Sequence, residues 1–372
     1  MSGQPQSQYN LNFQIMPSLF LGTVDCMASW REYILRFKEV LRSDIFLDSR
    51  YFIYLKMTLH LSHISPVAAI QLSDRLITVA GKKYDSDSNK TLVLIGSNGI
   101  ATVSYCGLAY LGTTPSDNFI AKSLIGNPPL FRGRIPLHGS NTFNNKRTID
   151  QIIHKIVGDL ENWFRRSYQD KRQFFGISVC GWRARRHYCE PILFSIVKEA
   201  RCDKFTYRDV PARHWWWSFE SQTNNLPKGY LNDAEFEAIA SLPEISTYSN
   251  GKMFIDERKK CLLSIIRRAA DSTGLVGHDA ISVIMQPMNR SNNVYIELEP
   301  LVRREIQDGL LGAIPVTYTP WIIGSSSYFA PSIFSGGQFA HHANGFNIIL
   351  NAPSNHVGVL QMGSISRPPP PR

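Results

Sequence analysis

A short Asn-Gly turn between two apolar runs restricts the fold of this chain more than any other feature of its sequence. Residues 91–95 (TLVLI) and 100–106 (IATVSYC) lie on either side of it. Asn-Gly tolerates the positive φ angles of a tight hairpin turn, so both runs are predicted to be antiparallel strands. Upstream, residues 58–64 (TLHLSHI) alternate apolar and polar side chains, as a half-buried strand does. We expect residues 58–80 and 91–106 to form adjacent antiparallel strands of one sheet.

Helical and strand patterns alternate through the rest of the chain. The clearest helical signal covers residues 147–166, whose apolar side chains share one face: Ile149, Ile152, Ile153, Ile156, Val157, Leu160, Trp163 and Phe164. Ser116 is predicted to cap an earlier helix. Further helices are predicted at 30–41, 232–240 and 257–271, and further strands at 68–74, 174–182, 191–197, 279–286, 294–298 and 346–351. This order favours an α+β fold of two stacked antiparallel sheets with helices outside.

Composition and charge narrow the class of protein. The 372 residues are 43% apolar and 19% charged, which suits one large domain with extensions, or two domains. The net charge is +10, with basic residues gathered at 132–134, 162–172 and 181–188. A basic surface attracts nucleic acid or acidic partners, so a nucleic-acid-associated protein is one alternative. No helix-turn-helix, zinc-finger or RNP signature accompanies the charge, which makes nucleic acid the weaker choice of partner.

The cysteines and the apolar runs bear on location and on cofactors. Six cysteines without CxxC pairs are typical of reduced thiols in a cytoplasmic protein. The spacing of Cys180, His187 and Cys189 fits no common zinc pattern, so no metal is expected there. No apolar run is long enough to span a membrane, and no basic leader precedes residues 15–22. We therefore expect a cytoplasmic protein without a membrane partner.

The order of elements, together with four positions, resembles the N-terminal-nucleophile (Ntn) hydrolases, and among them the proteasome β subunits and the bacterial HslV-type peptidases. In that family a threonine begins the first strand, Asp-Arg-x-x-Thr ends the second, a lysine opens the third and a glycine follows the fourth. Here Thr58, residues 74–78 (DRLIT), Lys90 and Gly107 take these places. The aspartate and the lysine stand 16 and 32 residues after the threonine. Small bacterial proteasome-like proteins that open with Met-Thr are similar as well.

The resemblance implies a four-layer αββα sandwich and a threonine peptidase or amidohydrolase without metal or organic cofactor. Thr58 would be the nucleophile, with its own α-amine as base. Lys90 would lower the pKa of that amine, Asp74 would hold the lysine, and the Gly107 N–H would stabilise the oxyanion. Supporting roles are implied for Arg75, Thr78, Asp271 and Ser272. The implied partners are a peptide or amide substrate and further copies of the chain in a homo-oligomer.

The sequence departs from the family pattern at its two ends. Residues 1–57 precede Thr58, and Met57 stands where proteasome precursors carry a glycine, so Thr58 has no free amine until those residues are absent. We expect 1–57 to be a partly helical extension, either a propeptide or a segment upstream of a start at Met57. An Ntn-like domain would cover 58–290, a β-rich extension of it 291–360, and a disordered Pro-rich tail 361–372. If 1–57 stay attached, the alternative is a catalytically silent scaffold that acts by assembly or binding.

Overall fold

The computed structural model describes the chain in stretches: residues 58–79, 82–85, 88–126, 146–209, 216–221, 251–288, 290–299, 317–325, 328–331, 333–334, 337–343, 345–352 and 360–361. The N-terminal extension, the helices predicted at 30–41 and 232–240 and nearly all of the Pro-rich tail lie outside these stretches. Of the helices within them, none has the length and hydropathy that crossing a membrane requires.

Two seven-stranded sheets, one three-stranded sheet and two strand pairs make up the β-structure of the described residues. The first sheet contains, in spatial order, β12 (Trp216–Ser221), β1 (Leu59–Ile64), β2 (Ala69–Asp74), β13 (Ala280–Met285), β14 (Asn293–Glu299), β20 (Phe346–Ala352) and β19 (Gly337–Ala343). The second contains β11 (Thr206–Asp209), β10 (Cys189–Lys198), β9 (Phe175–Ala184), β6 (Gly99–Gly107), β5 (Thr91–Gly96), β16 (Ile322–Ile323) and β17 (Tyr328–Phe329). The short strands are β3 (Ile77–Val79), β4 (Lys82–Asp85), β7 (Tyr110–Leu111), β8 (Thr114–Pro115), β15 (Thr317–Tyr318), β18 (Ile333–Phe334) and β21 (Leu360–Gln361).

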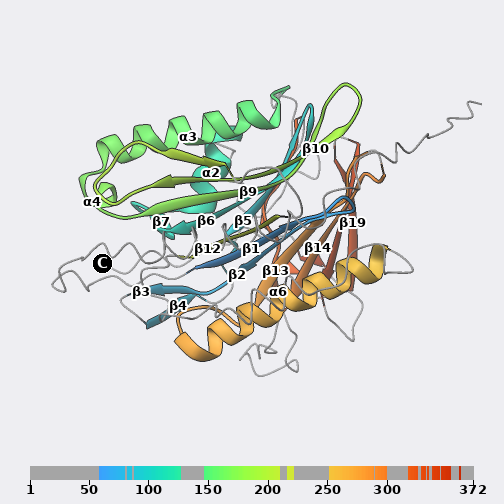
Figure 1. Ribbon diagram of the computed structural model, residues 1–372. Helices are drawn as coiled ribbons and strands as arrows, with labels where there is room; N and C mark the ends of the chain where they lie inside the picture. The colour runs from blue at the N-terminus through green and yellow to red at the C-terminus, as the bar shows by residue number, and fades with distance from the viewer. Residues whose placement is uncertain are drawn as a thin grey trace, which may run out of the picture. The chain divides into compact units, whose positions relative to one another are not determined.

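The Asn-Gly hairpin is confirmed, because β5 and β6 pair in antiparallel register up to Gly96 opposite Gly99. The expectation that residues 58–80 and 91–106 share one sheet is wrong. Antiparallel β1 and β2 belong to the first sheet, whereas β5 and β6 belong to the second. The ladder positions beside β2 and β5 are taken by β13 and β16, which come from much later in the chain. The two hairpins therefore lie in facing sheets (Figure 1).

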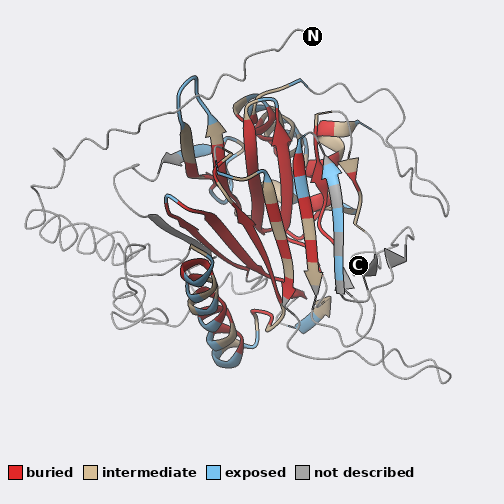
Figure 2. Cartoon of the chain, turned by 90° about the vertical axis from the view of Figure 1, so that its right-hand side faces the viewer, coloured by how far each residue is buried: buried red, intermediate tan, exposed pale blue. Residues whose placement is uncertain are grey.

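Burial of β5 on both faces explains why its side chains are apolar at consecutive positions. In β5, Leu92 and Leu94 pack with the helices over the second sheet, whereas Val93 and Ile95 pack in a cluster with residues of both sheets. Leu59 of β1 belongs to a third cluster, which it shares with the long helix over the first sheet. Figure 2 shows the central strands of both sheets buried over most of their length.

Helix α3 (Ile149–Arg166) confirms the clearest helical signal of the sequence. Thr148 caps it by accepting a hydrogen bond from the Gln151 N–H, and the Gln151 side chain accepts one from the Thr148 N–H. This reciprocal capping box satisfies donors that the first helical turn leaves open. The predicted apolar face is buried except for Trp163, which is partly buried and donates its Nε1–H to Asp170.

The remaining helices cover the outer faces of the two sheets. Helix α2 (Ser116–Ile125) and the short α4 (Tyr168–Lys171) lie near α3, and α6 (Gly251–Thr273) packs on the first sheet (Figure 1). The predicted cap of α2 is wrong, because Ser116 is its first helical residue and Pro115 is the capping position. The Ser116 hydroxyl instead donates to the Leu108 carbonyl at 2.7 Å.

The C-terminal part of the chain contributes strands to both sheets. β20 pairs in parallel with β14 of the first sheet, and β16 pairs in parallel with β5 of the second. The sheets are therefore mixed, whereas the sequence predicted antiparallel ones. Two parallel strands need a long connection between them, because the chain must return to start the second strand in the same direction. Residues 97–321 separate β5 from β16, and residues 300–345 separate β14 from β20.

Candidate functional site

Asp74 and Lys90 form a buried ion pair between the two sheets. Asp74 ends β2 of the first sheet, and Lys90 directly precedes β5 of the second. The Lys90 Nζ lies 3.0 Å from Oδ1 and 2.9 Å from Oδ2 of the carboxylate. The two side chains are 0% and 3% exposed, so little solvent screens the pair. Burial lowers the pKa of Lys90, and the adjacent carboxylate opposes that shift by favouring the ammonium form.

The Asp74 carboxylate also accepts three backbone hydrogen bonds. The Leu59 N–H donates to Oδ1 at 2.8 Å, and the N–H groups of Leu76 and Gly277 donate to Oδ2, both at 3.1 Å. Leu59 directly follows Thr58, so one carboxylate fixes both the ammonium and the backbone of the candidate nucleophile. Hydrogen bonds to an ionised acceptor are stronger than those between neutral groups, which makes Asp74 the organising residue of the site.

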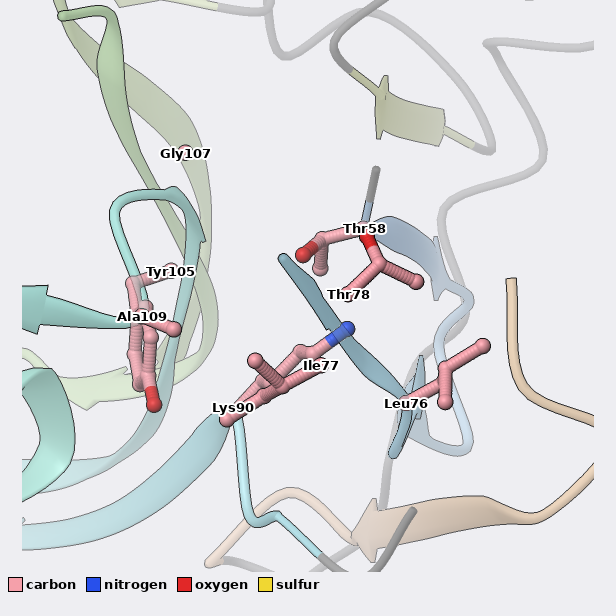
Figure 3. Close-up of a pocket in the computed structure, with 8 residues that line it drawn as sticks. All are labelled: Thr58, Leu76, Ile77, Thr78, Lys90, Tyr105, Gly107 and Ala109. Carbon is pink, nitrogen blue, oxygen red and sulfur yellow. The ribbon is translucent and has the colours of Figure 1, made fainter. Parts of the chain in front are cut away.

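Thr58 is buried and lines a small pocket together with residues that precede or belong to strands of both sheets. The pocket is lined by Thr58, Leu76, Ile77, Thr78, Lys90, Tyr105, Gly107 and Ala109 (Figure 3). The Thr58 hydroxyl points into the pocket, and the Lys90 side chain extends toward the same space with its ammonium foremost. The described hydrogen bonds of the Lys90 ammonium go to Asp74 and not to Thr58.

Gly107 is a position that only glycine fills without strain. It ends β6 with φ +98°, in the left-handed region that other residues avoid. A Cβ placed there would lie 2.3 Å from the Phe174 carbonyl oxygen, far inside van der Waals contact. The backbone of Gly107 therefore reaches the pocket without a side chain over it.

Of the four supporting residues, the structure brings two to the site and leaves two apart. Arg75 is buried next to Asp74, and Thr78 lines the pocket. Asp271 and Ser272 belong to the last turn of α6, where the Ser272 hydroxyl donates to the Ala269 carbonyl. The Asp271 carboxylate instead lies 3.5 Å from His278 Nε2 and is largely exposed. The turn after α6 contributes to the site through the backbone N–H of Gly277.

Sequence reasoning missed a histidine that contacts the pocket wall. His60 is buried on β1, two residues after Thr58, and its Nε2 lies 2.6 Å from the Tyr105 carbonyl oxygen. Strand alternation places Thr58 and His60 on the same face of β1, and this was a signal that the sequence offered. The contact itself joins residues 45 positions apart, so no local pattern indicated it.

Two arginines of the basic segment at 180–190 form ion pairs with acidic side chains of this chain. Arg183 pairs with Asp150 and Glu190, and Arg185 also bonds Glu190. Cys180 lies in the core, where burial raises the pKa of its thiol. Within the described stretches, no three His, Cys, Asp or Glu side chains gather as a metal ion would require.

Comparison with known proteins yields matches among solved structures. No protein-family model and no curated protein matches the sequence. The chain is similar to Anbu (ancestral beta-subunit) from Yersinia bercovieri, with 11% identity over 62% of this chain and 82% of that one, at a TM-score of 0.39. It is similar to eukaryotic HslV from Trypanosoma brucei, with 10% identity over 61% and 99%, at 0.33. An Anbu (Gly-1) mutant from Hyphomicrobium sp. strain MC1 gives 10% identity over 62% and 82%, at 0.38. With every TM-score below 0.5, these likenesses alone decide neither fold nor activity.

Proposed function

We propose that this chain is an Ntn-type threonine hydrolase that cleaves peptide or amide bonds once Thr58 has a free α-amine. The observation that carries the proposal is the Asp74 carboxylate, which holds the Lys90 ammonium and the N–H of the residue after Thr58 in one buried cluster. A structural ion pair alone would not need to be attached to the backbone of a pocket threonine. We further propose that the two sheets and their outer helices form a four-layer αββα sandwich, with residues 291–360 part of the same domain.

The proposed chemistry assigns each residue a separate task. The Thr58 hydroxyl attacks the carbonyl carbon of the substrate while its α-amine takes the hydroxyl proton. The Lys90 ammonium lowers the pKa of that amine through its charge, so that the amine is unprotonated and able to accept. The Gly107 N–H donates to the oxygen of the tetrahedral intermediate. The amine then returns its proton to the leaving group, and water hydrolyses the resulting ester.

The proposal requires that residues 1–57 be absent from the active form. In the full chain the nitrogen of Thr58 is part of the peptide bond to Met57 and has no basic lone pair. Two routes lead to a free amine: translation from Met57 with removal of that methionine, and cleavage of the Met57–Thr58 bond. A homo-oligomeric state and a cytoplasmic location also stay predictions.

The test is the mass of the native protein combined with a covalent probe. We expect purified protein to begin at Thr58 and to form a one-to-one adduct with a peptide epoxyketone, which reacts with a hydroxyl and an amine on the same residue. The Thr58→Ser variant should keep the adduct and Thr58→Ala should lose it. Peptide hydrolysis by protein that keeps residues 1–57 would refute Thr58 as nucleophile. Retention of those residues with no hydrolysis would favour the silent scaffold.

A further inference from the structure

The space between the two sheets is polar next to the site and apolar farther away. Around the site, buried polar side chains from both sheets face one another: His60, Gln71 and Ser73 from the first, and Thr91, Thr102 and Ser104 from the second. Farther along the same strands, the space is filled by apolar side chains such as Ile64, Val93 and Ile95. A buried polar group costs free energy unless it is hydrogen-bonded. The hydrogen bonds among these side chains offset that cost and connect the two sheets in a polar network.

The hydroxyl part of this network joins the neighbours of the site residues. Ser73 precedes Asp74 and bonds Thr91 Oγ1 at 2.8 Å, and Thr91 follows Lys90. The Thr91 hydroxyl also bonds Ser104 Oγ at 2.6 Å. The chain of three hydroxyls therefore connects β2 with β5 and β6 one residue away from the ion pair.

His60 provides a second cross-sheet contact on the nucleophile's own strand. Because a carbonyl oxygen only accepts, the 2.6 Å contact with Tyr105 requires a proton on His60 Nε2. Burial and then the nearby Lys90 charge lower the pKa of His60 to about 3, so the imidazole is neutral at physiological pH. The Tyr105 N–H donates to the Lys90 carbonyl at 2.9 Å, which places Tyr105 between the imidazole and the lysine backbone.

The His60–Tyr105 hydrogen bond lies close in sequence to Thr58 and Gly107, the two residues that contact the substrate in the proposed reaction. His60 lies two residues after Thr58 on β1, and Tyr105 lies two residues before Gly107 on β6. In the proposed reaction, Thr58 supplies the attacking oxygen and Gly107 the oxyanion donor, yet the two belong to different sheets. The ion pair and the Ser73–Thr91 bond join β2 to β5, whereas the His60–Tyr105 bond joins β1, the strand after Thr58, directly to β6, which ends at Gly107.

We propose that His60 is a positioning residue, whose Nε2–H bond to the Tyr105 carbonyl sets the spacing between Thr58 and Gly107 across the two sheets. This inference rests on the proposed function for its kinetic consequence. It assigns His60 no proton transfer and no contact with substrate. Small misplacements of reacting groups cost up to about a hundred-fold in rate, so loss of this bond should lower kcat rather than raise KM.

Three variants of the full-length gene test the proposal. His60→Leu removes the bond, His60→Gln keeps an N–H donor at similar reach, and His63→Leu is the matched control. His63 is also a buried imidazole of β1, but it packs against Phe254 on the α6 side, away from the pocket. We expect H60L to lower kcat by about ten-fold or more with little change in KM, H60Q to recover most of it, and H63L to keep the wild-type kcat.

Activity-independent measurements separate failure of this inference from failure of the proposed function. Nitrogen NMR of the wild type should show His60 as the Nε2–H tautomer, and crystal structures should show the Thr58–Gly107 spacing widened in H60L but not in H63L. Equal kcat in H60L and H63L, an Nδ1–H tautomer, or an unchanged spacing in H60L would overturn the positioning role. If wild-type protein with a free Thr58 amine hydrolyses nothing, the proposed function fails, and the tautomer and the spacing still decide the role of His60.

Discussion

At the scale of single residues, Asp74 and Lys90 depend on each other because both side chains are almost fully buried. Removing one partner leaves the other as a buried, unpaired charge, which costs about 3–5 kcal/mol. We expect Lys90→Met to lower the free energy of unfolding by that amount, and Asp74→Ala to lower it further, because Asp74 also accepts three backbone N–H bonds. Urea denaturation measures both values. A Lys90→Met variant as stable as the wild type would mean that the ammonium is solvated and the pair is not buried.

Gly107 and Gly126 offer a comparison between strain and crowding. Both have positive φ, +98° and +78°, but a Cβ on Gly126 would meet no atom within 4 Å. Gly126 has ψ −155°, a combination that is nearly restricted to glycine, so Gly126→Ala should cost about 1–3 kcal/mol, the conformational penalty alone. Gly107→Ala should cost more, because the backbone at Phe174 has to move as well. Thermal denaturation of both variants checks the order, and equal melting temperatures would contradict the crowding at Gly107.

At the scale of elements, β1 contains two buried imidazoles on opposite faces. Burial, with the charges of Lys90 and Arg258 as second causes, lowers the pKa values of His60 and His63 from 6.5 to about 3. Between pH 6.5 and about 3 the unfolded chain binds more protons than the folded one, so stability falls as pH falls through this window. At about 1.4 kcal/mol per pKa unit, each group contributes at most about 5 kcal/mol.

This pH dependence is measurable as proton uptake on unfolding. At pH 5, these two histidines should together bind close to two protons when the wild type unfolds, and His63→Leu should reduce the number by about one. Urea midpoints from pH 7 to pH 5 give the uptake. Identical slopes for the variant and the wild type would show that His63 titrates normally in the folded protein.

The elements themselves were predictable from the sequence to different degrees. Helix α3 and the β5–β6 hairpin follow from local patterns, a 3.6-residue apolar period and an Asn-Gly turn, and both are present. The assignment of strands to sheets was not local. Both hairpins are buried on each face, so the pattern of side chains does not indicate which neighbour covers which face. Serine is a common capping residue, which favoured Ser116 as the cap of α2. In the structure the helix already begins at Ser116, and Pro115 occupies the capping position.

The candidate site was predictable only as residue types in order. The resemblance to the Ntn hydrolases implied that Thr58, Asp74 and Lys90 form a cluster, because they match the threonine, aspartate and lysine of that family in order and spacing. The Gly277 N–H and the Tyr105 carbonyl are backbone groups. Nearly every residue has such groups, so the residue type does not indicate which of them contact the site. Supporting roles for Asp271 and Ser272 were implied by the family resemblance alone, and both residues lie on α6 rather than in the pocket lining.

At the scale of the whole molecule, the C-terminal strands complete both sheets. A chain that ends at residue 316 loses β16 beside β5 and β20 beside β14, and with them buried side chains such as Ile322, Ile348 and Leu350. At about 1.5–3 kcal/mol for each large apolar side chain, this loss approaches the whole stability of a typical domain. We expect that chain to lose cooperative unfolding, whereas a chain ending at 352 should keep it. Calorimetry of the two decides, and a cooperative transition in the shorter chain would make 317–352 dispensable.

The bond from Gly277 to Asp74 has a consequence for the time at which the site can exist during synthesis. The two residues are 203 positions apart, and a ribosome adds roughly 5–20 residues per second. The strands that bear Thr58, Asp74 and Lys90 thus leave the ribosome roughly 10–40 s before the group that completes the carboxylate's contacts. Throughout that interval the Asp74 carboxylate lacks one of its three backbone donors, so the cluster seen in the folded chain is complete only after most of the chain has been made.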